Sequence, residues 1–246
     1  MPSSILIVQM TRPPREVCQA HGEQPDWFRA VLHAAGVQTE VVCPSDGDAL
    51  PDVHAVAGAI ITGSWAMVTD KADWSERTAG WVREMVAAER PLLGVCYGHQ
   101  LMAHALGGTV DYHPSGPEVG CHPIAVAASA RDDPFFSGLP ETFDAFLTHE
   151  QSVLVPPPGA TVLGRSDHDA HQILRYGPKA VSVQFHPEFT PALMAACIQR
   201  RSNWLEENGR DVAAMLAALA PTVHSQRLLH WFAALAVPHG LTISHA

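Results

Sequence analysis

The sequence has few cysteines, and their spacing excludes two common uses of this residue. The five cysteines are odd in number and widely separated, and the chain has no Cys-x-x-Cys pair. A small domain held by disulfides would carry a dense, even set, and a zinc ribbon would carry paired cysteines. The sequence predicts neither, and it is typical of a protein of the reducing cytoplasm, where we expect this chain to act.

Basic residues are scarce, which limits the partners that the sequence favours. Fifteen Lys and Arg stand against 25 Asp and Glu, the net charge is −10, and no basic stripe runs along the chain. Affinity for nucleic acid depends on clustered positive charge, so no nucleic-acid partner is expected. The best apolar run, residues 53–62, is too short to cross a bilayer, and the first residues lack the pattern of a signal peptide. No membrane partner is expected either.

Motifs that bind phosphate groups are absent as well. The chain contains neither Gly-x-x-x-x-Gly-Lys-[Ser/Thr] nor Gly-x-Gly-x-x-Gly, so we expect no nucleotide cofactor. Metal-ligating residue types gather at Asp167, His168, Asp169 and His171. A polar turn between two strands explains this stretch as well as a metal site does, and we expect no metal.

The first half of the chain alternates between apolar runs and helical periodicity. Runs at 5–10, 39–43, 55–62 and 92–95 predict buried strands, and apolar residues at helical spacing predict helices between and after them. Asp26 is the expected N-cap of the first helix, and residues 73–76 resemble a capping box. This alternation predicts an α/β fold with a doubly wound, mainly parallel sheet and helices on both faces.

After Gly108 the pattern changes to short strands separated by turn residues. Strands are expected at 109–111, 124–128, 143–148, 161–164, 172–176 and 180–185, which predicts an antiparallel section. Thr190 and Pro191 predict the start of a helix, and helical periodicity returns at 211–219 and 225–235. We find no repeat or linker. The sequence therefore predicts a single domain over 1–246, with a core over about 5–208 and a helical C-terminal extension over 210–246.

Cys96 stands where the predicted strand 92–95 turns into a helix, with Gly94 and Gly98 on either side. This is the pattern of a nucleophile elbow, in which small flanking residues avoid collisions with the adjacent strand and helix. The helix N-terminus directs backbone N–H groups at the sulfur and favours the thiolate. The alternative is a structural cysteine at the end of a core strand, because buried free cysteines are common.

A cysteine nucleophile needs a base, and the base needs a group that orients it. His186 follows the predicted strand 180–185, so it can face the crevice at the carboxyl ends of the strands, where Cys96 also lies. Glu188 follows across Pro187 and can accept a hydrogen bond from the imidazole. Alternatively, His186 is an ordinary surface histidine and residues 186–188 form a simple turn.

The two motifs together resemble a known family. Gly94-Val95-Cys96-Tyr97-Gly98-His99-Gln100, followed about ninety residues later by Gln184-Phe185-His186-Pro187-Glu188, is similar to the class I, triad-type glutamine amidotransferase domain. The resemblance is to a free-standing form of the glutaminase domain of GMP synthases, and it runs from about residue 5 to 189. It implies a flavodoxin-like fold and a catalytic triad of Cys96, His186 and Glu188.

Further segments match the family and imply more site residues. Residues 60–65 resemble the strand-ending turn of the oxyanion hole, with Ser64 and Trp65 where glycine and proline are usual, and residues 148–153 resemble a loop that lines the glutamine site. The resemblance implies an oxyanion hole of Gly63, Ser64 and Tyr97. It also implies substrate-binding roles for Gln100, His149 and Gln151, the last standing where aspartate is usual.

The resemblance implies hydrolysis of the side-chain amide of glutamine. The Cys96 thiolate attacks the amide carbon, His186 protonates the departing ammonia, and water then releases glutamate from a γ-glutamyl thioester. The ammonia would pass to a separate synthase partner or be released, and no cofactor is required. Two alternatives remain open: a γ-glutamyl peptidase or hydrolase that uses the same triad on a larger substrate, and a non-catalytic regulatory protein on the same fold.

Overall fold

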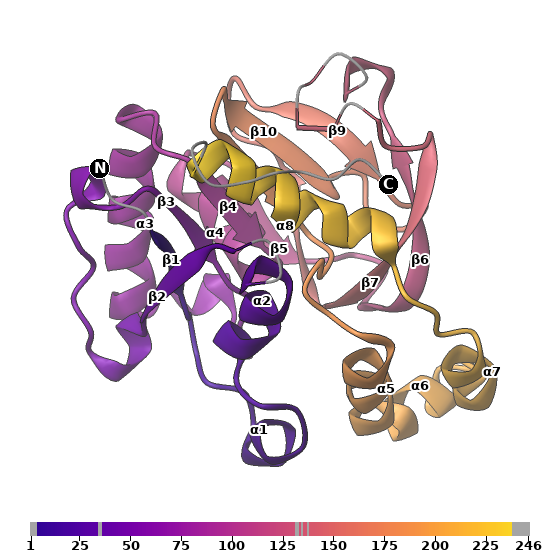
Figure 1. Ribbon diagram of the computed structural model, residues 1–246. Helices are drawn as coiled ribbons and strands as arrows, with labels where there is room; N and C mark the ends of the chain where they lie inside the picture. The colour runs from indigo at the N-terminus through magenta and orange to yellow at the C-terminus, as the bar shows by residue number, and fades with distance from the viewer. Residues whose placement is uncertain (1–3, 34–35, 131–132, 134, 137, 238–246) are drawn as a thin grey trace.

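The computed structural model describes residues 4–33, 36–130, 133, 135–136 and 138–237. These residues form one large sheet with helices on both faces, together with a two-stranded sheet (Figure 1). Residues 238–246 of the predicted C-terminal extension lie outside the described residues. No helix among the described residues is long and apolar enough to cross a membrane.

The large sheet has a parallel half and an antiparallel half. The parallel strands, in spatial order, are β2 (Gln38–Val42), β1 (Ser4–Val8), β3 (Gly58–Ile61), β4 (Leu92–Val95) and β11 (Ala180–Val183). The antiparallel strands continue from there as β10 (Ile173–Gly177), β9 (Thr161–Arg165), β6 (Glu118–Val126) and β7 (Thr142–His149). The strands β6, β7, β9 and β10 follow Gly108 and pair antiparallel with one another, as predicted. The strand β11, which we expected in the antiparallel section, instead joins the parallel half through β4.

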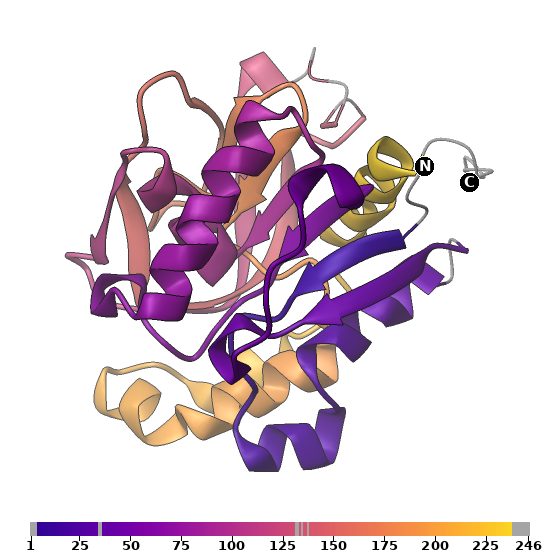
Figure 2. The ribbon, with the colours of Figure 1, turned by 90° about the vertical axis from the view of Figure 1, so that its left-hand side faces the viewer.

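Two helices cover each face of the sheet. One face carries α3 (Asp73–Ala87) and α4 (Tyr97–Ala105), and the other carries α2 (Gln24–Leu32) and α8 (Val223–Ala236). The rotated view in Figure 2 shows the sheet between α3 and the pair α2 and α8. Phe28 of α2 and Phe232 of α8 are fully buried in the same apolar cluster. The predicted C-terminal extension thus contributes a helix to the core.

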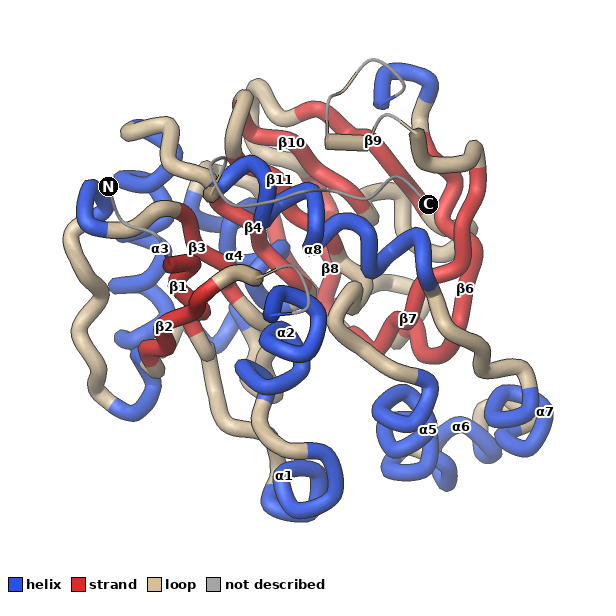
Figure 3. The backbone as a smooth tube through the Cα atoms, viewed as in Figure 1, coloured by secondary structure: helices blue, strands red, loops and turns tan. Residues whose placement is uncertain are grey.

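Short helices lie beyond the carboxyl ends of the parallel strands, below the sheet in Figure 3. They are α1 (Arg15–His21), α5 (Pro191–Arg200), α6 (Ser202–Glu207) and α7 (Val212–Ala217). Thr190 caps α5, since its hydroxyl oxygen accepts from the Leu193 N–H at 3.3 Å, and Pro191 is the first helical residue. The predicted helix start at Thr190 is confirmed.

Two predicted helix caps are wrong, although α3 does begin at Asp73. Glu23 is the N-cap of α2, and Asp26 lies three positions inside, where its carboxylate accepts from the Glu23 N–H at 3.2 Å. Ala72 precedes α3, so Asp73 is already helical and caps nothing with its side chain. An acidic residue in the first turn interacts with the same unpaired N–H groups as a capping residue does, so its presence alone does not locate the helix boundary.

Two elements have no counterpart among the predictions. The helix α1 buries one side chain, Val17, so it has no apolar stripe for periodicity to detect. The strand β8 (Gln151–Val155) pairs antiparallel with β5 (Thr109–Tyr112) to make the two-stranded sheet. Its first residues fall within 148–153, which the family resemblance assigns to a loop.

Candidate active site

Cys96 occupies a sharp bend between β4 and α4, with φ of 52° and ψ of −101°. A positive φ is strained for a residue with a side chain and costs about 1–3 kcal/mol, so the surrounding structure must hold it. The neighbouring glycines permit the bend. A Cβ on Gly98 would lie 2.3 Å from the Ile61 carbonyl oxygen, and a Cβ on Gly94 would lie 2.5 Å from the Gly98 carbonyl oxygen. The predicted elbow is therefore present, and its glycines are required by close packing.

His186 and Glu188 form a buried pair beyond the end of β11. Nδ1 of His186 lies 2.8 Å from Oε1 of Glu188, and both residues are less than 5% exposed. The Phe189 ring stacks on the imidazole at 4.0 Å between centroids. Burial alone lowers the pKa of His186, but the carboxylate of Glu188 and the thiol of Cys96 outweigh it and hold that pKa above its usual value. The pair therefore favours the imidazolium.

Three adjacent parallel strands bring the predicted catalytic residues together. Gly63 follows β3, Cys96 follows β4 and His186 follows β11, all at the same edge of the sheet. A Cβ placed on Gly63 would lie 3.0 Å from Cε1 of His186 and 3.7 Å from Cβ of Cys96. Nε2 of His186 is buried and has no hydrogen-bond partner among the described residues, so it is free for the thiol or a substrate.

A cavity of about 290 Å³ opens over the thiol. Among the residues predicted for the site, those that line it are Ser64, Cys96, Tyr97, Gln100, His149, Gln151 and His186. Glu188 lies behind His186, and Gly63 lies beside the thiol. The structure thus gathers all nine predicted residues around one cavity.

The turn after β3 is fixed by its own side chains. The Ser64 hydroxyl lies 2.9 Å from the Thr11 hydroxyl and accepts from the Ala66 N–H at 2.9 Å, while the Trp65 N–H donates to Thr11 at 3.2 Å. The serine that stands where glycine is usual therefore holds the turn together. On the other side of the thiol, the Tyr97 amide begins α4, and its ring is stacked on Trp74 at 5.9 Å, away from the bend.

The side chains of Gln100 and Gln151 are already hydrogen-bonded within the protein. Nε2 of Gln100 donates to the Gln151 carbonyl at 2.5 Å and to Oε1 of Gln184 at 3.1 Å. The Gln151 amide pairs with Thr69 through Nε2, which donates to the Thr69 hydroxyl at 2.6 Å. Both glutamines line the cavity, but these contacts give them a supporting role in its wall.

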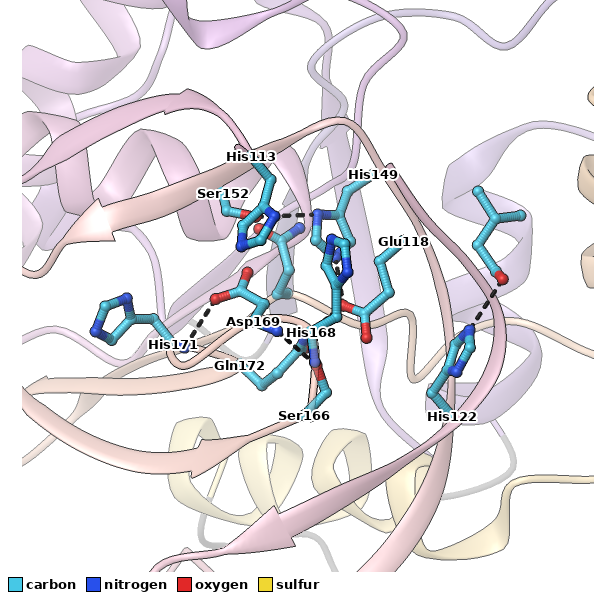
Figure 4. Close-up of polar contacts among 12 residues, drawn as sticks. His113, Glu118, His122, His149, Ser152, Ser166, His168, Asp169, His171 and Gln172 are labelled. Atoms are coloured by element: carbon cyan, nitrogen blue, oxygen red, sulfur yellow. Dashed lines mark hydrogen bonds and ion pairs between the residues drawn. The ribbon is translucent and has the colours of Figure 1, made fainter. Parts of the chain in front are cut away.

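His149 is also anchored from behind. Its Nδ1 lies 3.0 Å from the Gln151 carbonyl, and its Nε2 lies 3.0 Å from Oε2 of Glu118, which also accepts from Gln172 at 2.8 Å (Figure 4). Burial raises the pKa of Glu118, but the contacts with His149 and Ser166 outweigh it and lower that pKa. His149 therefore lies between the cavity and a second, buried polar cluster.

The stretch 167–171, considered above for metal binding, belongs to this cluster. Nε2 of His168 lies 2.9 Å from the Gly116 carbonyl, and Nδ1 of His171 lies 2.6 Å from the Val153 carbonyl. Within the described ranges, no group of three His, Cys, Asp or Glu side chains is arranged to hold a metal ion. The histidines instead join the turn to neighbouring backbone.

Sequence reasoning missed several residues that line the cavity, among them Gln24, Cys197, Arg200 and Arg201. Arg200 pairs with Glu16 of α1, and Arg201 pairs with Glu150 at 2.9 Å. Burial raises the pKa of Cys197 to about 12, although Arg201 opposes the effect. A raised pKa disfavours the thiolate form of Cys197. Each of these residues reaches the site through packing of α2 or α5, which no local motif marks.

Comparison with known proteins identifies the family. Residues 27–202 match the model of the family "Glutamine amidotransferase class-I", and the chain belongs to that family. The GMP synthase (glutamine-hydrolyzing) of Aeropyrum pernix is 32% identical over 64% of this chain, and the match covers 29% of that protein. The chain thus corresponds to less than a third of that relative.

Other relatives match over more of their length. Gamma-glutamyl peptidase 5 of Arabidopsis thaliana is 27% identical over 74% of this chain and 68% of the relative. Among solved structures, a glutamine amidotransferase from Thermotoga maritima superposes with a TM-score of 0.73 at 20% identity, covering 96% of this chain and 97% of that one. At this identity the structural match supports the fold.

Proposed function

We propose that the chain hydrolyses the side-chain amide of glutamine through a thioester on Cys96. The observation that carries this proposal is the convergence of three strand ends, which sets Cys96 beside the buried His186–Glu188 pair and the turn at Gly63. Cysteine, base and orienting carboxylate are the parts that a thiol-dependent acyl transfer requires.

In this mechanism the thiolate attacks the amide carbon and His186, held as the imidazolium by Glu188, gives its proton to the leaving ammonia. The negative oxygen of the tetrahedral intermediate is stabilised by the backbone N–H groups of Ser64 and Tyr97. Water, activated by the now neutral His186, then attacks the thioester and releases glutamate. The cavity walls at Gln100, His149 and Gln151 hold the rest of the substrate.

The direct test is release of ammonia and glutamate from free glutamine. We expect turnover by the wild-type protein and loss of at least about 10³-fold in Cys96→Ser, with an unchanged melting temperature. Cys197→Ser is the matched control, because it removes the second thiol of the cavity, and it should keep most of the activity. Turnover that survives Cys96→Ser would overturn the proposal.

A second candidate is hydrolysis of γ-glutamyl peptides. Arg200 and Arg201 of the α5 end line the cavity, and an arginine offers several donors to a carboxylate on a larger leaving group. In addition, the match to the Arabidopsis gamma-glutamyl peptidase covers most of that relative. If this function holds, γ-glutamyl-glycine is hydrolysed faster than glutamine, and Arg201→Gln raises KM for the peptide by roughly tenfold without changing KM for glutamine. Equal effects on both substrates would reject it.

A synthase partner forms the last part of the proposal. The match to the Aeropyrum GMP synthase supports the proposal that the released ammonia is used by a synthase activity, which we place on a partner subunit. Co-purification of such a protein with the wild-type chain, and stimulation of glutamine turnover on mixing, are the expected results. Full glutamine turnover by the isolated chain, unchanged by any synthase, would contradict this part and leave hydrolysis itself intact.

A further inference from the structure

Gln24, the first residue of α2, is hydrogen-bonded to the turn beside the thiol. Its Nε2 donates to the Gly63 carbonyl at 3.1 Å, and its Oε1 accepts from the Thr62 hydroxyl at 3.0 Å. The side chain is buried, with 2% of the residue exposed, and Nε2 lies 3.6 Å from where a Cβ on Gly63 would be. No motif in the sequence marks this glutamine, which lies between Glu23 and Pro25.

Thr62 completes the arrangement. Its hydroxyl lies 2.9 Å from the Gly63 carbonyl and accepts from the Met10 N–H at 3.2 Å, so the segment that follows strand β1 also supports it. Thr62 and Gln24 are both buried. The single hydroxyl hydrogen of Thr62 is shared between Oε1 of Gln24 and the Gly63 carbonyl, so Nε2 of Gln24 is the donor committed to that carbonyl. Rotating that carbonyl away would leave this buried donor unpaired, which costs about 1–3 kcal/mol.

The orientation of this carbonyl fixes the next N–H group. The peptide bonds among the described residues are trans, so the Ser64 N–H points opposite to the Gly63 carbonyl. No acceptor for the Ser64 N–H is found in the part of the chain that the structure describes. If the peptide plane turned over, a carbonyl oxygen would replace this N–H and would repel the negative oxygen of the tetrahedral intermediate.

We propose that Gln24 is a positioning residue that holds the Gly63–Ser64 peptide with its N–H available to the oxyanion. The inference rests on the proposed function, because it assigns a role in the same acyl transfer. Gln24 thereby prepares the oxyanion hole before substrate arrives, and a preorganised donor contributes to the transition state without reorganisation. Thr62 supports the same peptide from the strand side.

The test separates oxyanion stabilisation from nucleophilicity. Hydrolysis of glutamine needs both, whereas alkylation of Cys96 by iodoacetamide forms no oxyanion and reports the thiolate alone. For Gln24→Met we expect kcat to fall about 10- to 100-fold, less than the 10²–10³ typical when a donor is deleted, with KM changed by less than about twofold. The rate of Cys96 alkylation, followed by peptide mass spectrometry, should stay within about twofold of wild type.

Two further variants complete the design. Thr62→Val removes the second contact to the carbonyl and should lower kcat in the same direction, again with normal alkylation. Gln9→Met is the matched control, because Gln9 is an equally buried glutamine of the same region whose amide donates to Glu23 at 3.1 Å and not to the turn. It should keep wild-type kcat.

Three outcomes would overturn the inference. A wild-type kcat in Gln24→Met would show that the peptide needs no such support. A parallel loss of kcat and of alkylation would assign Gln24 a purely structural role, and so would an equal loss in Gln9→Met. A wild-type protein that alkylates at Cys96 but releases no glutamate would instead refute the proposed function, and the inference with it.

Discussion

At Gly63 the demands of packing and of the proposed chemistry coincide. The position has an ordinary backbone conformation, so glycine is not needed there for its φ. It is needed because a Cβ would approach Cε1 of His186 to 3.0 Å, closer than nearly all real contacts of that kind. The absence of a side chain at Gly63 is therefore what lets the imidazole stand beside the turn.

Replacing Gly63 by alanine tests this packing directly. The added methyl group should push the His186 ring by a few tenths of an ångström and lower kcat by about 10- to 100-fold, since small misplacements of catalytic groups are costly. The melting temperature should change little, because a Cβ on Gly63 is closest to the His186 ring and otherwise makes contacts of 3.6 Å or longer. Gly177→Ala is a suitable control, since a Cβ there meets nothing within 4 Å. Unchanged kcat in Gly63→Ala would contradict the account.

Glu188 should set the alkaline limit of activity. Its carboxylate helps to hold the pKa of His186 above the usual value, so the imidazolium persists as pH rises. In Glu188→Gln that pKa falls, the imidazolium is lost at lower pH, and the alkaline limb of the kcat/KM profile should move down by about 1–3 pH units. Glu118→Gln, which alters the pair with His149, should leave this limb in place. An unmoved alkaline limb in Glu188→Gln would contradict the assigned pairing.

The residues of the site differ in how far the sequence alone could predict them. Cys96, His186 and Glu188 are marked by short local patterns. Cys96 follows a strand and is flanked by glycines, and His186 and Glu188 are separated by one proline. Gln24 and Arg201 reach the cavity only because α2 packs on one face of the sheet and α5 packs beyond the strand ends. Contacts of that kind depend on tertiary structure, and a single sequence does not encode them as a motif.

At the level of secondary structure, predictability follows the degree of burial. The strand β4 was predicted with its observed bounds, because Leu92–Val95 is an apolar run enclosed by Pro91 and the bend at Cys96. The helix α1 buries a single side chain and leaves no periodic signal. Burial on one face creates the periodic pattern that sequence reasoning detects, and α1 lacks it. The strand β8 was missed for a different reason: its first residues, Gln151 and Ser152, are buried but polar, so they form no apolar run.

His99 links α4 to the sheet by a hydrogen bond, and we expect it to make the free energy of unfolding depend on pH in the acidic range. Its Nδ1 lies 2.7 Å from the Ser182 hydroxyl of β11. Burial lowers the pKa of His99 to about 3, although Asp169 opposes the effect. A histidine with a depressed pKa binds fewer protons when folded than when unfolded. The contribution of His99 to the free energy of unfolding is therefore fully present above about pH 6.5 and is lost as pH falls towards 3.

Urea unfolding at two pH values measures this contribution. Between pH 6.5 and 5.5 the free energy of unfolding should fall by about 1 kcal/mol more in the wild type than in His99→Gln, because one proton is taken up on unfolding. The variant is expected to be less stable at pH 7, since it weakens the contact with Ser182. Parallel pH dependence in the two proteins would show that His99 is not the group responsible.

Over the whole molecule, the candidate active site lies at the carboxyl ends of the parallel strands, and the apolar core lies between the sheet and the helices on its two faces. The α2–α8 and α3–α4 layers bury the two faces of the sheet, while α1 and α5 to α7 lie beyond the carboxyl ends of its parallel strands (Figure 1). The ion pair between Arg200 of α5 and Glu16 of α1 joins two of these short helices. Arg200 and Arg201 line the cavity as ion-paired cations, Arg200 with Glu16 and Arg201 with Glu150.

The central claim is that Cys96 carries the γ-glutamyl group during turnover. Rapid acid quenching of wild-type protein mixed with glutamine, followed by peptide mass spectrometry, should find a glutamyl adduct on the Cys96 peptide and on no other cysteine. In Glu188→Gln the adduct should accumulate to a higher level, because water activation by His186 in the deacylation step loses its orienting carboxylate. Turnover of glutamine with no adduct on Cys96 at any quench time, or with an adduct on another residue, would contradict the account.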